Sequence, residues 1–83
     1  MEDSKVLDLI KYVVSTFAES KDEVEYTVEE KEEAIEVTIH LAPSDMGKVI
    51  GRQGKIAKAL RTLVGSATPR ESKRYLVEIK ERA

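Results

Sequence analysis

The chain has 83 residues, of which 41% are hydrophobic, and a formal net charge of −2. This length and composition indicate one small globular domain and exclude a disordered chain. Cysteine is absent, which excludes disulfides and thiolate metal sites and is typical of a reducing compartment. The apolar stretch at residues 6–18 contains Asp8 and Lys11, so we interpret it neither as a secretory signal nor as a membrane span. We therefore expect a soluble, cytoplasmic protein that does not act at a membrane.

The net charge conceals a strong separation of charge along the chain. Residues 1–46 contain four Lys/Arg and thirteen Asp/Glu, a net charge of −9, whereas residues 47–83 contain ten Lys/Arg and three Asp/Glu, a net charge of +7. Such a basic half favours a surface that faces a polyanion, with the acidic half facing elsewhere. Charge alone leaves open a second interpretation, a merely solvated surface on a heat-tolerant protein.

The first half of the chain predicts one helix and two strands. Apolar residues at helical spacing predict a helix from about Ser4 to Ala18. Its apolar stripe consists of Val6, Leu7, Leu9, Ile10, Val13, Val14 and Phe17. Alternation of apolar and polar residues then predicts two half-buried strands joined as a hairpin by an exposed, charged turn. The inward residues are Val24, Tyr26 and Val28 in the first strand and Ile35, Val37, Ile39 and Leu41 in the second.

The second half predicts two helices and a last strand. Pro43 and Ser44 favour the start of a short helix that ends at about Ile50, because proline suits a first helical turn and serine suits a cap. A further helix is predicted from about Gly54 to the breakers at residues 65–69. Its expected core stripe is Ile56, Leu60, Leu63, Val64 and Ala67. The final strand, residues 74–80, places Tyr75, Val77 and Ile79 on one face.

The predicted order of elements is α-β-β-α-α-β, without a repeat, linker or low-complexity segment. This order indicates a single two-layer α+β domain over residues 1–83, with the helices packed on one face of a three-stranded sheet.

Glycine is costly inside a helix, so the pair Gly51 and Gly54 between two predicted helices needs an explanation. A P-loop would require glycine at position 49 and a hydroxyl at position 56, where the chain has Val49 and Ile56. The dinucleotide fingerprint Gly-x-Gly-x-x-Gly also fails at Val49. The sequence therefore contradicts both nucleotide-binding motifs and leaves a helix, a Gly-x-x-Gly turn and a second helix.

That arrangement predicts a site for phosphate groups. Glycines let the backbone approach a ligand, and the following helix points its N-terminus, with free amides and a partial positive charge, at that ligand. Arg52 lies at the tip of the turn, Lys48 and Lys55 flank it, and Lys58 continues along the second helix, as does Arg61. We interpret these residues as a clamp for a phosphate backbone.

The stretch VIGRQGKIA, residues 49–57, resembles the signature of the KH domain, Val/Ile-Ile-Gly-x-x-Gly-x-x-Ile. One departure is that Ile56 comes one place early and Ala57 occupies the last apolar position. The element order resembles the type II, prokaryotic KH arrangement. In size, in residues 41–64 and in the closing KRYLVEIKE, the chain is similar to the KhpA family of small bacterial KH proteins.

The resemblance implies a cytoplasmic protein that binds single-stranded RNA and acts as an RNA chaperone or post-transcriptional regulator. It also implies a role in cell shape, elongation and cell-wall homeostasis, homodimerisation, and a KhpB (Jag)-type RNA-binding partner. KH loops clamp about four nucleotides of backbone. Carried over by position, the RNA-binding residues are Lys48, Ile50, Gly51, Arg52, Gln53, Gly54, Lys55 and Lys58. For Ile50 and Ile56, ordinary packing is favoured over contact with bases.

We expect weak, permissive binding, because base discrimination by single-strand readers often depends on aromatic stacking. Tyr26, Tyr75 and Phe17 are expected in the core, and Tyr12 lies on a helix distant in sequence from the loop. Phosphate-dominated affinity of this kind is roughly micromolar. A partner domain would then be needed for useful affinity.

The remaining polar residues favour plain structural roles. The single histidine, His40, faces outward on a strand and cannot form a zinc site by itself. We interpret Ser44 and Asp45 as helix caps rather than catalytic groups, and Gly47 as a site of close helix packing. The acidic run at residues 29–33 is interrupted by Lys31 and predicts a solvated turn rather than a metal site. No catalytic constellation, cofactor or metal is expected, so we predict that the protein is not an enzyme.

Two classes of function remain open. The first is an RNA-binding module. The second is a protein-interaction module, in which the same helix–loop face mediates homo- or heterodimerisation. Salt distinguishes them, because phosphate binding weakens steeply with ionic strength whereas an apolar dimer does not.

Overall fold

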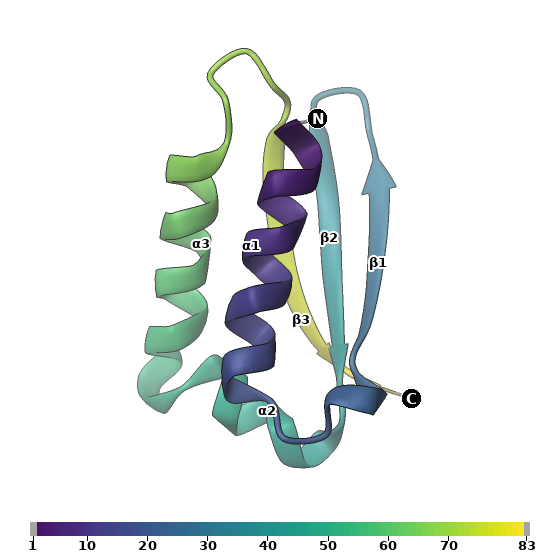
Figure 1. Cartoon of the computed structure of the whole chain (residues 1–83), viewed down its shortest axis with the longest axis vertical. Helices are drawn as coiled ribbons and strands as arrows, with labels where there is room; N and C mark the ends of the chain where they lie inside the picture. The colour runs from purple at the N-terminus through teal and green to yellow at the C-terminus, as the bar shows by residue number, and fades with distance from the viewer. Residues whose placement is uncertain (1, 83) are drawn as a thin grey trace.

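The computed structural model describes residues 2–82, and for residues 2–4 it describes the backbone alone. In chain order the elements are α1 (Glu2–Phe17), the 3₁₀ turn η1 (Lys21–Glu23), β1 (Glu25–Glu30), β2 (Ala34–Leu41), α2 (Pro43–Ile50), the 3₁₀ turn η2 (Arg52–Gly54), α3 (Lys55–Ala67) and β3 (Arg74–Glu81) (Figure 1). The predicted order α-β-β-α-α-β is confirmed, and the two short 3₁₀ turns are additions to it. No helix within the described range is both long and apolar enough to cross a bilayer.

The sheet has the strand order β1-β2-β3, and the helices cover one of its faces (Figure 1). β1 and β2 pair antiparallel, with Tyr26 opposite Ile39. β2 and β3 pair parallel, with Val37 opposite Val77. Parallel neighbours need a crossover connection, and α2 and α3 provide it. This α+β architecture agrees with the predicted fold class of a KH domain.

Strand β2 forms the centre of the core. Its predicted alternation is confirmed, because Ile35, Val37, Ile39 and Leu41 are all buried while the residues between them are only half-buried. The helices bury the rest of the cluster against this strand. Their buried members are Val6, Ile10, Val14 and Ala18 from α1 and its end, Val49 from α2, and Leu60 and Val64 from α3.

Two predicted apolar stripes differ from the structure at individual positions. Phe17, expected in the core, is 40% exposed, and Ala18 is buried in its place. Positions 6, 10, 14 and 18 follow i, i+4 spacing, which turns position 17 to the side of the helix. On α3, Leu63 is 47% exposed and Ala67 is exposed, whereas Ala57 is buried. The predicted stripe on α3 was therefore correct at Leu60 and Val64 and wrong at Leu63 and Ala67, because packing on the sheet buries a narrower face of the helix.

The sheet order separates the two charge halves in space. The acidic strand β1 is one edge of the sheet, and β3 is the other edge, on the side where α3 lies (Figure 1). Ion pairs still join the two halves. Lys73 Nζ donates to Glu30 Oε2 at 2.7 Å and to the Lys31 carbonyl at 2.8 Å, Arg82 pairs with Glu25, and Lys48 pairs with Glu19. The helix α3, with its cationic residues, thus lies toward the edge of the sheet opposite the acidic strand β1 (Figure 1).

Candidate functional site

Gly51 ends α2 in a backbone conformation that requires glycine. Its φ and ψ are +82° and 169°, in a region that other residues almost never occupy. A Cβ atom at this position would lie 2.6 Å from Cγ1 and 3.0 Å from Cβ of Ile56. The backbone N–H of Gly51 donates to the Gly47 carbonyl at 2.9 Å. Local conformation and close approach to Ile56 therefore both explain this glycine.

The glycine loop, residues 51–54, presents unpaired backbone donors at its tip. Gln53 has φ 59° and ψ 25° and Gly54 has φ 75° and ψ 15°, so two successive residues are left-handed. Within the described chain, the N–H groups of Arg52 and Gln53 donate to no acceptor. Their side chains are exposed. Consecutive free N–H groups in such a turn form a concave site for an anion.

The amides at the start of α3 differ from the expectation. The Gly54 N–H donates to the Gly51 carbonyl at 3.1 Å, and the Lys55 N–H donates to the Arg52 carbonyl. These two amides are therefore not available to a ligand. The free donors, those of Arg52 and Gln53, lie three and two residues before the first residue of α3, in the loop itself.

The cations around the loop fall into two groups. Arg52, Lys55 and Lys58 are exposed, and no carboxylate of the described residues lies within 4.0 Å of them. Lys48 instead pairs with the carboxylate of Glu19. The positive charge of Lys48 is thus partly neutralised in the free protein, which the sequence did not indicate because the two residues are far apart in the chain.

Ile50 and Ile56 are half-buried and belong neither to the buried core cluster nor to the apolar residues packed against it. They flank the glycine loop on its two sides. Both therefore offer some apolar surface next to the free N–H groups.

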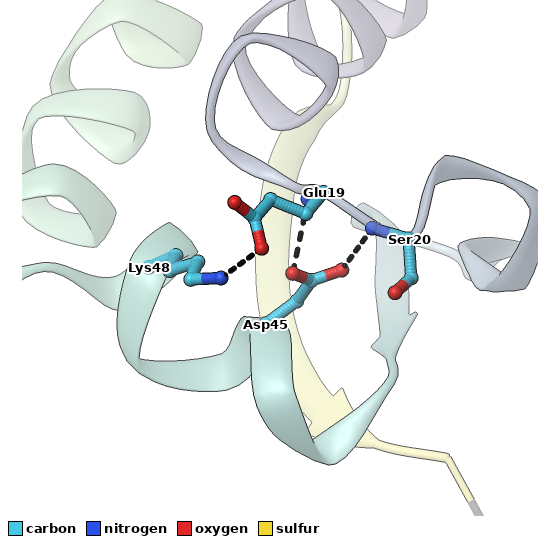
Figure 2. A network of polar contacts seen from close by, with 4 residues as sticks. All are labelled: Glu19, Ser20, Asp45 and Lys48. Carbon is cyan, nitrogen blue, oxygen red and sulfur yellow. Dashed lines mark hydrogen bonds and ion pairs between the residues drawn. The ribbon is translucent and has the colours of Figure 1, made fainter.

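Asp45 is the polar residue that the sequence reasoning misjudged. Its side chain is fully buried and accepts hydrogen bonds from the backbone N–H groups of Glu19 at 3.0 Å and Ser20 at 2.9 Å (Figure 2). These two bonds, then the charge of Lys48, hold the pKa of the Asp45 carboxyl below its ordinary value despite its burial. The interpretation of Asp45 as a helix cap was wrong, since the residue joins α2 to the segment that follows α1. An aspartate in a first helical turn carries no sequence signal for such a distant partner.

Two further structural interpretations were wrong. Ser44 does not cap α2, because the N-cap residue is Ala42 and no side chain caps the helix. Gly47 is exposed, and a Cβ there would meet nothing within 4 Å, so close packing does not explain it. Pro43, by contrast, lies in the first turn as predicted.

The other residues singled out in the sequence lie away from the loop. His40 Nε2 forms a hydrogen bond of 3.0 Å with Thr27 Oγ1 on the outer face of the sheet. Among the described residues, no three His, Asp or Glu side chains are grouped to hold a metal ion. Tyr26 and Tyr75 pack against the core as predicted, and burial raises the pKa of Tyr26. Tyr12 is 73% exposed on α1.

An exposed apolar hollow on α3 was not predicted. Leu63 lines it together with Lys55, Lys58, Ala59 and Thr62. The two lysines at its border are also the cations beside the glycine loop. Any partner that covers this hollow would therefore reach the edge of the loop.

Comparison with known proteins finds one matching family model and several similar proteins. The family model described as KhpA/KhpB, KH domain matches residues 7–79. The RNA-binding protein KhpA of Caldanaerobacter subterraneus subsp. tengcongensis is 43% identical over 72 residues, covering 87% of this chain and 96% of that protein. The KhpA proteins of Clostridium acetobutylicum (42% identical over 71 residues, covering 86% and 95%) and Bacillus subtilis (38% identical over 79 residues, covering 95% and 98%) are similarly close.

Proposed function

Because this chain belongs to the KhpA/KhpB KH-domain family, we propose that it is an RNA-binding protein that holds single-stranded RNA at its glycine loop. The observation that carries this proposal is the pair of unpaired N–H groups of Arg52 and Gln53 at the tip of a left-handed turn. Backbone donors and cations recognise phosphates without reading sequence. The proposed role is therefore binding rather than catalysis.

Each site residue has a separate part in the proposal. Gly51 and Gly54 supply the turn, and the N–H groups of Arg52 and Gln53 donate to a phosphate. Arg52 adds its guanidinium, and Lys48, Lys55 and Lys58 add positive charge along the strand. The half-buried side chain of Ile50, with its neighbour Ile56, offers apolar surface to the bases.

The resemblance to the KhpA family supports a finer biological proposal. Residues 1–83 act as one type II KH domain in the cytoplasm, as an RNA chaperone or post-transcriptional regulator. The protein works with a KhpB (Jag)-type RNA-binding partner in cell shape, elongation and cell-wall homeostasis. The absence of an aromatic residue from residues 43–67 supports weak, permissive binding by the domain alone and therefore a need for a second domain or partner.

The proposal is tested by the double substitution Arg52→Asp with Gln53→Asp. We expect the anisotropy of a labelled short single-stranded RNA to show at least a tenfold loss of affinity, because two negative charges would lie against the phosphates. Aspartate tolerates the left-handed conformation at position 53 better than most residues, so the fold is retained. Wild-type affinity should fall with salt with a log–log slope of roughly 0.7 per engaged cation.

The matched control is Lys80→Asp with Thr27→Asp. It makes the net charge more negative by the same amount as the loop variant does, but on the outer face of the sheet. Both residues are exposed and lie on the face that the helices do not cover. RNA binding that survives in the loop variant, or that falls equally in the control, would contradict the glycine loop as the site.

The ion pair between Lys48 and Glu19 gives a second prediction. Glu19→Gln leaves the backbone N–H that Asp45 accepts but releases the Lys48 ammonium for a phosphate. Because an exposed ion pair contributes about 0.2–1 kcal/mol, RNA affinity should rise by up to about fivefold. Glu25→Gln is the control, since Glu25 also forms an exposed ion pair, with Arg82, but lies at the start of β1 rather than beside the glycine loop. An equal gain in both variants would mean that only net charge matters.

A specific observation supports a second candidate function. Leu63, 47% exposed in the hollow on α3, supports an apolar contact with a second protein chain, as a homodimer or heterodimer. Light scattering on the samples of the RNA experiment distinguishes the two functions. If RNA does not bind and mass is unaffected by salt but lowered by Leu63→Ser, the helix–loop face is an interaction surface.

A further inference from the structure

A positively charged hollow lies at the end of α3 away from the glycine loop. It is lined by Arg61, Gly65, Thr68, Pro69, Arg70, Ser72, Arg74 and Tyr75, and we call it the distal hollow. The segment between α3 and β3 contributes Thr68, Pro69, Arg70 and Ser72 to its lining. This segment lies at the end of α3 opposite the glycine loop (Figure 1). The sequence reasoning gave no role to this segment.

The distal hollow is rich in guanidinium groups that are not neutralised. Arg70 and Arg74 are exposed, and no carboxylate of the described residues lies within 4.0 Å of either. Arg61 is held in place, because its Nε donates to the Val77 carbonyl at 3.1 Å on the free edge of β3. The nearby Lys73 is already paired with Glu30. Glu71 lines the adjoining hollow but not this one.

This arrangement suits a phosphate group rather than an apolar ligand. Guanidinium groups bind phosphate oxygens with two parallel hydrogen bonds and keep their charge at any physiological pH. Three such groups converge here from α3, from the connecting segment and from the start of β3. The elements that carry them are joined by the Arg61 contact with β3, so the hollow is partly organised before a ligand binds.

The distal hollow is too far from the glycine loop to serve the same phosphate. Ten residues of α3 separate Lys55 from Gly65, which is about 15 Å at 1.5 Å per residue. Lys58 and Arg61 lie between the two positions, and neither has a carboxylate partner among the described residues. A continuous line of unneutralised cations therefore connects the loop to the hollow.

We propose that the distal hollow is a second phosphate site for the same RNA strand, which engages nucleotides beyond those held at the glycine loop. This inference rests on the proposed function, since it takes the glycine loop as the first contact. It makes affinity depend on RNA length: a strand confined to the loop gains nothing from Arg70 and Arg74, and a longer strand gains both.

The test compares a labelled tetranucleotide, the length that a KH loop clamps, with a decanucleotide of the same repeat. We expect Arg70→Ala with Arg74→Ala to leave tetranucleotide affinity unchanged and to reduce decanucleotide affinity to the same level. Each lost phosphate contact lowers the log–log salt slope by roughly 0.7. The decanucleotide slope should therefore fall by about 1.4, so a fourfold rise in salt weakens the wild type about sevenfold more than the variant.

Lys80→Ala is the control, because Lys80 is an exposed cation on the same strand as Arg74 but lies six residues further along it and does not line the distal hollow. The proposal would be overturned if the variant Arg70→Ala with Arg74→Ala bound the decanucleotide as tightly as the wild type does. An equal loss of affinity for the tetranucleotide and the decanucleotide would also overturn it. The glycine-loop variant separates the two ideas. If the variant Arg52→Asp with Gln53→Asp still binds the tetranucleotide, the proposed loop site is wrong. If only the variant Arg70→Ala with Arg74→Ala loses affinity for the decanucleotide, that loss still supports the distal hollow as a phosphate site.

Discussion

Replacing Asp45 with alanine is expected to lower the melting temperature by about 10 °C or more. The carboxylate is fully buried and accepts the backbone N–H groups of Glu19 and Ser20 (Figure 2). Alanine offers no acceptor, so both partly buried N–H groups lose their partner, and such unpaired donors are costly. Thermal unfolding followed by circular dichroism at neutral pH measures the change.

Two companion variants identify the cause of that loss. Lys48→Ala removes only the exposed ion pair with Glu19, and it should shift the melting temperature by a few degrees at most. Asp45→Asn keeps the volume of the side chain but replaces one acceptor oxygen with an N–H₂ donor. We expect it to be destabilised as well, and a stable asparagine variant would mean that packing rather than hydrogen bonding holds α2 in place.

The contribution of Asp45 also depends on pH. Its pKa in the folded protein is lowered by the hydrogen bonds from Glu19 and Ser20, so the unfolded chain binds the proton more readily. The stabilisation is therefore complete above the unfolded pKa of about 4 and is lost as the pH falls through the lower folded value. The gap in melting temperature between wild type and Asp45→Ala should close in that acidic range. A gap that is independent of pH would contradict the ionised carboxylate as the acceptor.

Gly51→Ala is expected to destabilise the protein by about 2–4 kcal/mol. The strained backbone conformation supplies part of this cost. The new methyl group supplies the rest, since it would lie 2.6 Å from Ile56 Cγ1 and 3.0 Å from Ile56 Cβ. The isoleucine cannot turn away freely, because it is β-branched and lies in the first turn of α3. Chemical denaturation monitored by circular dichroism measures the loss, and RNA affinity should fall with it as the loop is displaced.

The other glycines provide an ordered control series. Gly47→Ala adds a methyl group that meets nothing within 4 Å inside a helix, so it should stabilise the protein by about 0.5–1 kcal/mol. Gly54→Ala also meets nothing but keeps φ at +75°, and it should cost about 1–2 kcal/mol from strain alone. The expected order of stability is therefore Gly47→Ala, wild type, Gly54→Ala, Gly51→Ala. Equal stability of the last two would show that contact with Ile56 is unimportant.

The candidate site was predictable where it depends on local chain conformation. The glycine loop and its neighbouring cations are contiguous in sequence, and the positive φ angles of Gly51 and Gly54 are ones that glycine adopts readily. Its electrostatic state was not predictable. Lys48 is partly neutralised by Glu19, 29 residues away, and the distal hollow assembles Arg61, Arg70 and Arg74 from three elements.

By itself, the sequence determined the order of the helices and strands, the inward residues of β2 and the place of the glycine loop. These features follow from short-range periodicity and from backbone preferences that act within a few residues. Only the tertiary structure decided the parallel pairing of β2 with β3, the burial of Ala18 instead of Phe17, and the anchoring role of Asp45. Each of these depends on contacts between residues distant in the chain. Which face of a helix is buried, and which carboxylate meets which partner, is set when the elements pack together.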